Sequence, residues 1–152
     1  MVVGALLFII GAGISLTLIG FVASIFFWKS KVRALDRSHL PPVTILKPCR
    51  ENNDNEGENF DSYFRQDYPG NLELLFVVNS EKDSIVPVIH NLQKKYPSID
   101  AKVVVSTTDV ALFPKVNALY DGHQAATGEI IIWSDSDTIV RENYVTQMVA
   151  SL

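Results

Sequence analysis

Two aspartates separated by one residue are the first candidates for chemistry in this 152-residue sequence. Asp135 and Asp137 directly follow Ile130-Ile131-Ile132-Trp133, a run typical of a strand. If the strand geometry continues, alternate side chains point the same way, so both carboxylates can approach one ion. Hard divalent cations such as Mg²⁺ and Mn²⁺ prefer oxygen ligands and usually keep positions open for phosphate oxygens. The pair therefore suits a metal-diphosphate site, although Asp-x-Asp patterns also occur at solvated strand ends.

Apolar runs and turn-forming residues predict the elements that would position this pair. The spacing predicts strands over residues 43–46, 72–78, 101–105 and 129–133, and helices over 60–64, 84–96 and 116–126. The polar stretch 49–59 is rich in Asn, Asp and Gly, so we expect it to be a loop.

The alternation of strand and helix predicts an α/β domain with a mostly parallel, Rossmann-like sheet. Right-handed crossovers would bring the carboxyl ends of all strands to one edge, where open α/β sheets bind ligands. That edge would collect Lys47, the segments 79–83 and 106–115, and Asp135 with Asp137.

Composition divides the chain into three parts, which we assign as a transmembrane helix (1–28), a basic juxtamembrane linker (29–41) and the α/β domain (42–152). Val2 to Trp28 holds 27 residues without a charge. At about 1.5 Å per residue this is a helix of about 40 Å, longer than the roughly 30 Å hydrocarbon core of a bilayer. The alternatives are a cleaved signal peptide and a buried helix, but a signal peptide carries its positive charge before the apolar stretch.

The distribution of charge predicts that the domain lies on the cytoplasmic side of a membrane. Residues 29–50 carry six Lys or Arg and one Asp, and the rest of the chain carries 7 basic and 16 acidic residues. The basic cluster after the apolar stretch predicts a cytoplasmic location. The acidic remainder argues against a nucleic-acid partner. Cys49 is the only cysteine, which rules out an internal disulfide and a thiolate metal site.

Several segments together resemble the family-two-related glycosyltransferases with a GT-A fold, and among them the ceramide glucosyltransferases. The resemblance runs from about Leu40 to the end of the chain, in the family's order and with near-identical spacing. The matching segments are Pro42–Pro48, Tyr63-Phe64 with Asp67-Tyr68-Pro69, Leu74–Val78 leading to Asp83, Tyr96–Lys102, Pro114–Leu119, and Trp133–Asp137.

This resemblance implies roles for individual residues. Asp83 matches the family's first acidic motif on the nucleotide side, with Glu81 as an alternative because one extra residue follows Val78. Asp135 matches the second acidic motif, and Asp137 completes the metal-binding pair for Mg²⁺ or Mn²⁺. The donor-binding set is then Lys47, Asp83, Lys115, Asn117 and Asp135.

Each role has a structural alternative. Asp83 can simply cap the following helix, and Lys115 can be a solvated loop lysine. Lys47 can belong only to the end of the first strand. The sequence also departs from the family, with Ala111, Phe113 and Ala118 where Gly and Asn residues are usual.

The resemblance implies a membrane-bound, inverting enzyme that moves a hexose from a UDP-sugar to a lipid such as ceramide. The alternatives are a hopanoid, diacylglycerol or polyprenyl phosphate acceptor, or a truncated fragment that only binds nucleotide sugar. The family's third acidic motif, which supplies the general base, and its Arg-Trp motif are expected beyond Leu152.

Overall fold

The computed structural model describes residues 2–29, 34–49 and 56–152, and divides the chain into two units, residues 1–33 and 34–152. The first unit contains helix α1 (Val2–Lys29), whose side chains are exposed from Val2 to Phe27. Its most apolar window has a mean hydropathy of 2.5, so α1 is long and apolar enough to cross a membrane. The hydroxyls of Ser15, Thr17 and Ser24 donate to carbonyl oxygens one turn earlier, so the helix itself satisfies these polar groups.

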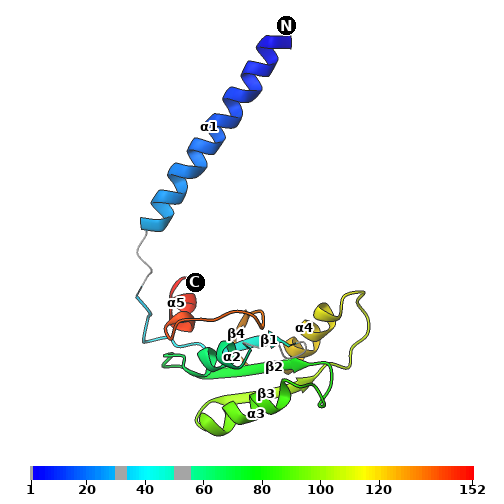
Figure 1. Ribbon diagram of the computed structural model, residues 1–152. Coiled ribbons are helices and arrows are strands. Elements are labelled where there is room, and N and C mark those ends of the chain that lie inside the picture. The colour runs from blue at the N-terminus through cyan, green and yellow to red at the C-terminus, as the bar shows by residue number, and fades with distance from the viewer. Residues whose placement is uncertain (1, 30–33, 50–55) are drawn as a thin grey trace. The chain divides into compact units, whose positions relative to one another are not determined.

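The second unit is built on a four-stranded parallel sheet with the order β3-β2-β1-β4 (Figure 1). The strands are β1 (Val43–Pro48), β2 (Leu72–Val78), β3 (Asp100–Val105) and β4 (Ile130–Trp133). The helices are α2 (Glu56–Phe64), α3 (Val86–Lys95), α4 (Pro114–Ala125) and α5 (Tyr144–Ala150). The chain adds β2 and β3 on one side of β1 and then crosses to place β4 on the other side. The predicted α/β fold with a parallel sheet is therefore confirmed.

Two apolar clusters hold the helices on the sheet. The larger cluster joins Ile45 and Phe76 of the sheet to Phe60, Phe64 and Ile89 of α2 and α3. Their spacing of three or four residues along each helix produces the apolar stripe that the sequence predicts.

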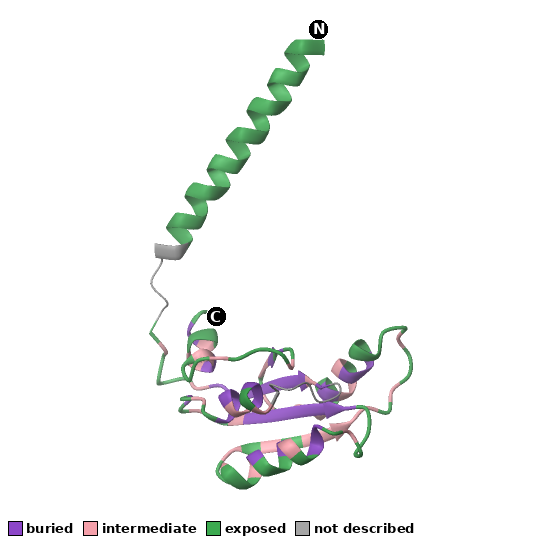
Figure 2. Cartoon of the chain, in the orientation of Figure 1, coloured by how far each residue is buried: buried purple, intermediate pink, exposed green. Residues whose placement is uncertain are grey.

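The smaller cluster joins Leu46, Leu75 and Val77 to Ala118 of α4. Gly122 lets α4 approach the sheet closely, because a Cβ there would overlap the Leu46 side chain and lie 2.8 Å from Val77 Cγ2. Figure 2 shows the resulting burial of the two central strands.

Two helical segments differ from the prediction. Residues 56–59 belong to α2, so the expected loop over 49–59 is wrong at its end; residues 50–55 lie outside the described residues. An acidic residue in the first turn of a helix is favourable, and the prediction did not take account of Glu58. Helix α5 was not predicted, because its seven residues are too few to show a clear period. Lys31 and Arg33 of the basic linker also lie outside the described residues.

A buried carboxylate lies on β2, at the end of the sheet away from Asp135. Glu73 is 4% exposed and accepts hydrogen bonds from Thr44 Oγ1 (2.6 Å), Lys102 Nζ (2.8 Å) and Thr127 N (2.9 Å). Burial alone raises the pKa of Glu73, but these hydrogen bonds outweigh burial and lower the pKa to about 2. The ionised carboxylate therefore joins β1, β2 and β3 to the segment before β4.

This network predicts a pH dependence of stability. Because the folded-state pKa of Glu73 lies below its ordinary value of 4.5, its contribution is complete above about pH 5 and is lost as pH falls through about 2. We expect Glu73→Gln to flatten the acid dependence of the free energy of unfolding and to cost about 2 kcal/mol at pH 7. Urea unfolding of the chain in detergent, at pH values from 7 to 2.5, measures both. Glu129→Gln, an exposed carboxylate, is the control, and an unchanged acid dependence in Glu73→Gln would contradict the prediction.

Candidate active site

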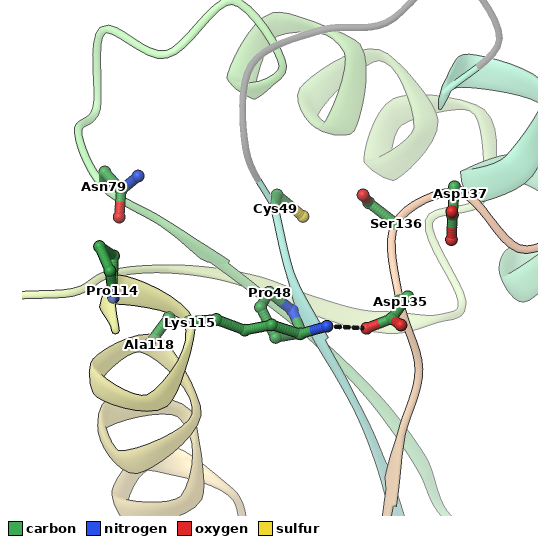
Figure 3. Close-up of a pocket in the computed structure, with 9 residues that line it drawn as sticks. All are labelled: Pro48, Cys49, Asn79, Pro114, Lys115, Ala118, Asp135, Ser136 and Asp137. Carbon is green, nitrogen blue, oxygen red and sulfur yellow. Dashed lines mark ion pairs between the residues drawn. The ribbon is translucent and has the colours of Figure 1, made fainter. Parts of the chain in front are cut away.

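A cleft of about 270 Å³ opens at the carboxyl edge of the sheet, beside the point where the strand order reverses (Figure 3). Open α/β sheets characteristically bind ligands at this position. Its lining comes from the ends of β1 and β2, the start of α4 and the segment after β4. The lining residues are Pro48, Cys49, Asn79, Pro114, Lys115, Ala118, Asp135, Ser136 and Asp137.

The two aspartates of the acidic motif both line this cleft and are both exposed. Strand β4 ends at Trp133, although Ser134 N still donates to Leu46 O at 3.0 Å. The chain then turns at residues 136 and 137, so strand geometry does not continue through the motif. In Figure 3 the Asp135 carboxylate points across the cleft and Asp137 lies further along the turn.

Lys115 and Asp135 form an ion pair across the cleft, with Lys115 Nζ 2.6 Å from Asp135 Oδ1 (Figure 3). The ammonium group also lies 5.1 Å from the centre of the Trp133 ring. The two paired side chains are 49% and 52% exposed, and an ion pair this accessible to water contributes little to stability. Lys115 can therefore leave Asp135 to bind an anion, and Asp135 can leave Lys115 to bind a cation.

Lys47 lies beneath the acidic turn and does not line the cleft. Its side chain is only 1% exposed, and its ammonium group donates to Asp135 O at 2.6 Å. The same group lies 3.6 Å from the centre of the Tyr63 ring, within the range of a cation–π interaction. The structure thus places Lys47 against the backbone that carries Asp135.

Three hydroxyl groups hold the turn by hydrogen bonds, and the sequence pattern does not indicate that they belong to the site. Tyr63 Oη lies 2.5 Å from Ser134 Oγ and 2.6 Å from Thr138 Oγ1, and Thr138 Oγ1 donates to Asp135 O at 2.8 Å. The only signal in the sequence is the hydroxyl of Tyr63, which otherwise follows the apolar spacing of α2. Buried tyrosine hydroxyls usually find a partner.

Asn117 and Asp83 lie outside the residues that line the cleft. Asn117 Oδ1 accepts from Ala111 N (2.9 Å) and Val110 N (3.3 Å), so its amide holds the loop before α4. Asp83 Oδ1 accepts from Ile85 N at 3.2 Å, in the turn before α3. The Asp83 carboxylate thus holds this turn, whereas the N-cap residue of α3 is Ile85, which makes no side-chain capping hydrogen bond.

Asp121 is a second residue that holds this loop, and the sequence pattern does not indicate it. Its carboxylate accepts from Ser106 Oγ, Thr107 N and both the backbone and the hydroxyl of Thr108, at 2.5 to 3.0 Å. These hydrogen bonds, above all that from the Thr108 hydroxyl, lower the pKa of Asp121 to about 2. Asp121 and Asn117 together fix the segment between β3 and α4, which leads into the cleft at Pro114.

The carboxylates that line the cleft suit a divalent cation that also binds a phosphate group. Within residues 2–29, 34–49 and 56–152 no group of three His, Cys, Asp or Glu side chains forms a metal site. Mg²⁺ sites that include substrate phosphates commonly use only one or two carboxylates. Asp135 and Asp137, the two carboxylates of the cleft lining, match that pattern.

Comparison with known proteins finds ceramide glucosyltransferases among the relatives of this chain. Ceramide glucosyltransferase 3 of Caenorhabditis elegans is 37% identical over 115 residues, covering 76% of this chain and 25% of that protein. Ceramide glucosyltransferase 1 of the same organism is 33% identical, covering 74% and 24%, and the Candida albicans ceramide glucosyltransferase is 32% identical, covering 72% and 22%. The chain spans about a quarter of the length of these curated relatives.

Solved structures confirm the fold. A mannosyltransferase from Pyrobaculum calidifontis, solved in complex with GDP-Man and Mn²⁺, superposes with a TM-score of 0.71 at 23% identity, covering 93% of this chain and 41% of that one. S. aureus TarS superposes with a TM-score of 0.55 at 17% identity, covering 72% and 19%. The α/β unit thus has the GT-A type of fold. The model of glycosyl transferase family 21 matches residues 12–152, so the chain belongs to this family, as the resemblance predicted.

Proposed function

We propose that this chain forms the donor-binding part of a membrane-bound glycosyltransferase that moves a hexose, glucose in the first instance, from a UDP-sugar to a lipid acceptor. The observation that carries the proposal is the Lys115–Asp135 pair, in which opposite charges face each other across a cleft at the switch point of the sheet. A nucleoside diphosphate bound with a divalent cation offers a matching anion and cation. The ceramide glucosyltransferases among the relatives support the sugar and the lipid.

Asp135 and Asp137 are the residues that would hold Mg²⁺ or Mn²⁺. When bound, the cation would neutralise negative charge on the diphosphate as it leaves. Lys115 lies at the start of α4, where the positive end of the helix dipole also favours an anion. Lys115 would then release Asp135 and approach the diphosphate from the opposite wall.

Direct displacement of the diphosphate by a lipid hydroxyl would invert the anomeric carbon. The hydroxyl must lose its proton during the attack, which requires a positioned base. Among the described residues, the cleft lining offers only the two carboxylates already assigned to the cation. We therefore assign the acceptor-activating base to none of the described residues.

Binding measurements with the 152-residue chain in lipid nanodiscs test the donor assignment. Titration calorimetry with UDP-glucose in Mn²⁺, in Mg²⁺ and in EDTA is expected to give a Kd at least about tenfold lower with metal. GDP-mannose in the same buffers tests the base preference. Equal affinity with metal and with EDTA would refute the cation site, and tighter binding of GDP-mannose would refute the UDP assignment.

Product analysis tests the acceptor. Membranes from cells that express the protein carrying this chain would be incubated with radiolabelled UDP-glucose and, in turn, ceramide, diacylglycerol, a hopanoid and polyprenyl phosphate. A labelled glycolipid is expected with ceramide and not with the others. Label in one of the other lipids alone would replace ceramide by that acceptor.

The apolar helix α1 and the basic residues after it support a membrane anchor with the domain on the cytoplasmic side. In sealed vesicles with their cytoplasmic face outward, we expect added protease to digest residues 34–152 and to leave a protected fragment containing α1. Detergent should abolish that protection, which serves as the control. A fully protected domain would place it on the opposite side.

A further inference from the structure

The segment between β3 and α4, together with the first turns of α4, exposes an unusual amount of apolar surface. Among the described residues of the 34–152 unit, nine large hydrophobic side chains are exposed, and five of them lie between positions 110 and 120. Single exposed apolar side chains are normal, but a cluster marks a contact surface. We call this cluster the apolar rim; its members are Val110, Leu112, Phe113, Val116 and Tyr120.

The apolar rim is continuous along the chain and along one side of a helix. Leu112 is 90% exposed, Val110 84% and Phe113 67%. Val116 and Tyr120 are four residues apart, so they share one side of α4, and Phe113 is the N-cap residue directly before this helix. The buried residues of α4 are Asn117, Ala118 and Gly122, which face the sheet. Figure 2 shows the loop and the outer side of α4 as exposed.

Side-chain hydrogen bonds anchor the backbone of this loop, while its apolar side chains at 110, 112 and 113 are exposed. Asn117 binds the backbone N–H groups of residues 110 and 111, and Asp121 binds those of 107 and 108. Val116 N donates to Phe113 O at 2.9 Å. The exposure of the apolar rim therefore belongs to a loop with specific anchoring contacts.

The chain itself indicates what covers this surface. Residues 110–114 carry no charge, and only one short connection separates this domain from α1, whose length and composition suit a bilayer. A tethered domain meets the surface of its own membrane at a high effective concentration. Aromatic and aliphatic side chains projecting from a helix side are the usual means of entering the lipid–water interface.

We propose that the apolar rim inserts into the interface of the membrane that α1 spans. Pro114, Lys115 and Ala118 connect the apolar rim directly to the cleft, so insertion would hold the mouth of the cleft at the level of the lipid headgroups. The inference rests on the membrane-spanning role of α1, but it does not depend on sugar transfer or on the identity of the donor.

Site-directed fluorescence with the full chain in phosphatidylcholine nanodiscs tests this insertion. Leu112→Cys, at a highly exposed position, would carry the environment-sensitive label NBD, and the unmodified chain with its buried Cys49 gives the background labelling. Lipids with a nitroxide on the acyl chain quench only a label that enters the bilayer. We expect at least twofold quenching at position 112 and a blue-shifted emission. Val110→Cys provides a second, independent position in the same loop.

Two further labels make every outcome decisive. Asn91→Cys, exposed on α3, is expected to show no quenching, and Ser15→Cys, in the middle of α1, is expected to be quenched strongly. Quenching at position 15 with none at 110 and 112 would overturn the insertion while leaving the membrane span intact. A blue shift at 112 without quenching would also overturn it, because a protein surface would then cover the apolar rim. Absence of quenching at position 15 would refute the span itself.

Discussion

Replacing Asp135 with alanine is expected to raise the Kd for UDP-glucose in Mn²⁺ to the value measured in EDTA, a change of about 10- to 100-fold. Sugar transfer by the protein that carries this chain should fall at least about 100-fold, because the charge of the departing diphosphate would lose its counter-ion. The free energy of unfolding should change by less than about 1 kcal/mol, since the Lys115–Asp135 pair is half-exposed. Calorimetry and urea unfolding in detergent measure these quantities separately.

A carboxylate away from the cleft provides the matched control for this substitution. Glu142→Gln removes an exposed acidic group that does not line the cleft, and it should leave metal-dependent binding unchanged. Asp137→Ala tests the second proposed ligand in the same assay. If Asp135→Ala retained normal metal-dependent binding, the carboxylate would have no part in holding the cation.

Replacing the buried Lys47 with methionine is expected to weaken Mn²⁺ binding about tenfold even without nucleotide. Methionine keeps an unbranched apolar stem in the same space but removes the hydrogen bond to Asp135 O and the cation–π interaction with the Tyr63 ring. The turn that carries the Asp135 carboxylate would lose an anchor, as happens when groups that orient metal ligands are removed. The expected loss of folding free energy is about 1 to 3 kcal/mol.

Lys115→Met makes the same chemical change at an exposed lysine of the same cleft. Because Lys115 is proposed to contact the donor phosphates, its loss should weaken UDP binding in EDTA. A direct donor role for Lys47, as the resemblance implied, predicts the reverse pattern for Lys47→Met: normal Mn²⁺ affinity and weaker UDP binding in EDTA. The two variants therefore separate positioning from direct contact.

Much of the fold could be predicted because local and tertiary preferences agree. The run at 130–133 forms the partly buried edge strand β4, which pairs with β1. The run at 72–78 forms β2, which pairs with β1 and β3 and is buried from Glu73 to Val78. Parallel strands buried in this way have few alternatives to a sheet. Helix α5 escaped prediction because it is short, and its Val145 is buried only through packing in the main core.

The site could be predicted only in part. The order of strands and helices predicts which residues lie near one another, but it does not predict how their side chains are oriented. The carboxyl ends of the strands bring Asp135, Asp137 and Lys115 to one cleft, as the order of elements requires. The orientation of Lys47 depends on an aromatic ring from α2 and a carbonyl beyond β4, which are distant in sequence. The orientation of Asp121 likewise depends on residues of another segment, Ser106, Thr107 and Thr108, which follow β3.

The strand order also governs when this site can assemble during synthesis. Strands β1, β2 and β3 leave the ribosome in the order in which they pair, so most of the sheet can form early. One edge of β1 remains unpaired until β4 has left the ribosome, because Val43 pairs with Ile130. Such a long-range contact forms slowly, after more local ones. The acidic turn directly follows β4, so the nascent chain acquires most of its core before it acquires the edge that carries the cleft.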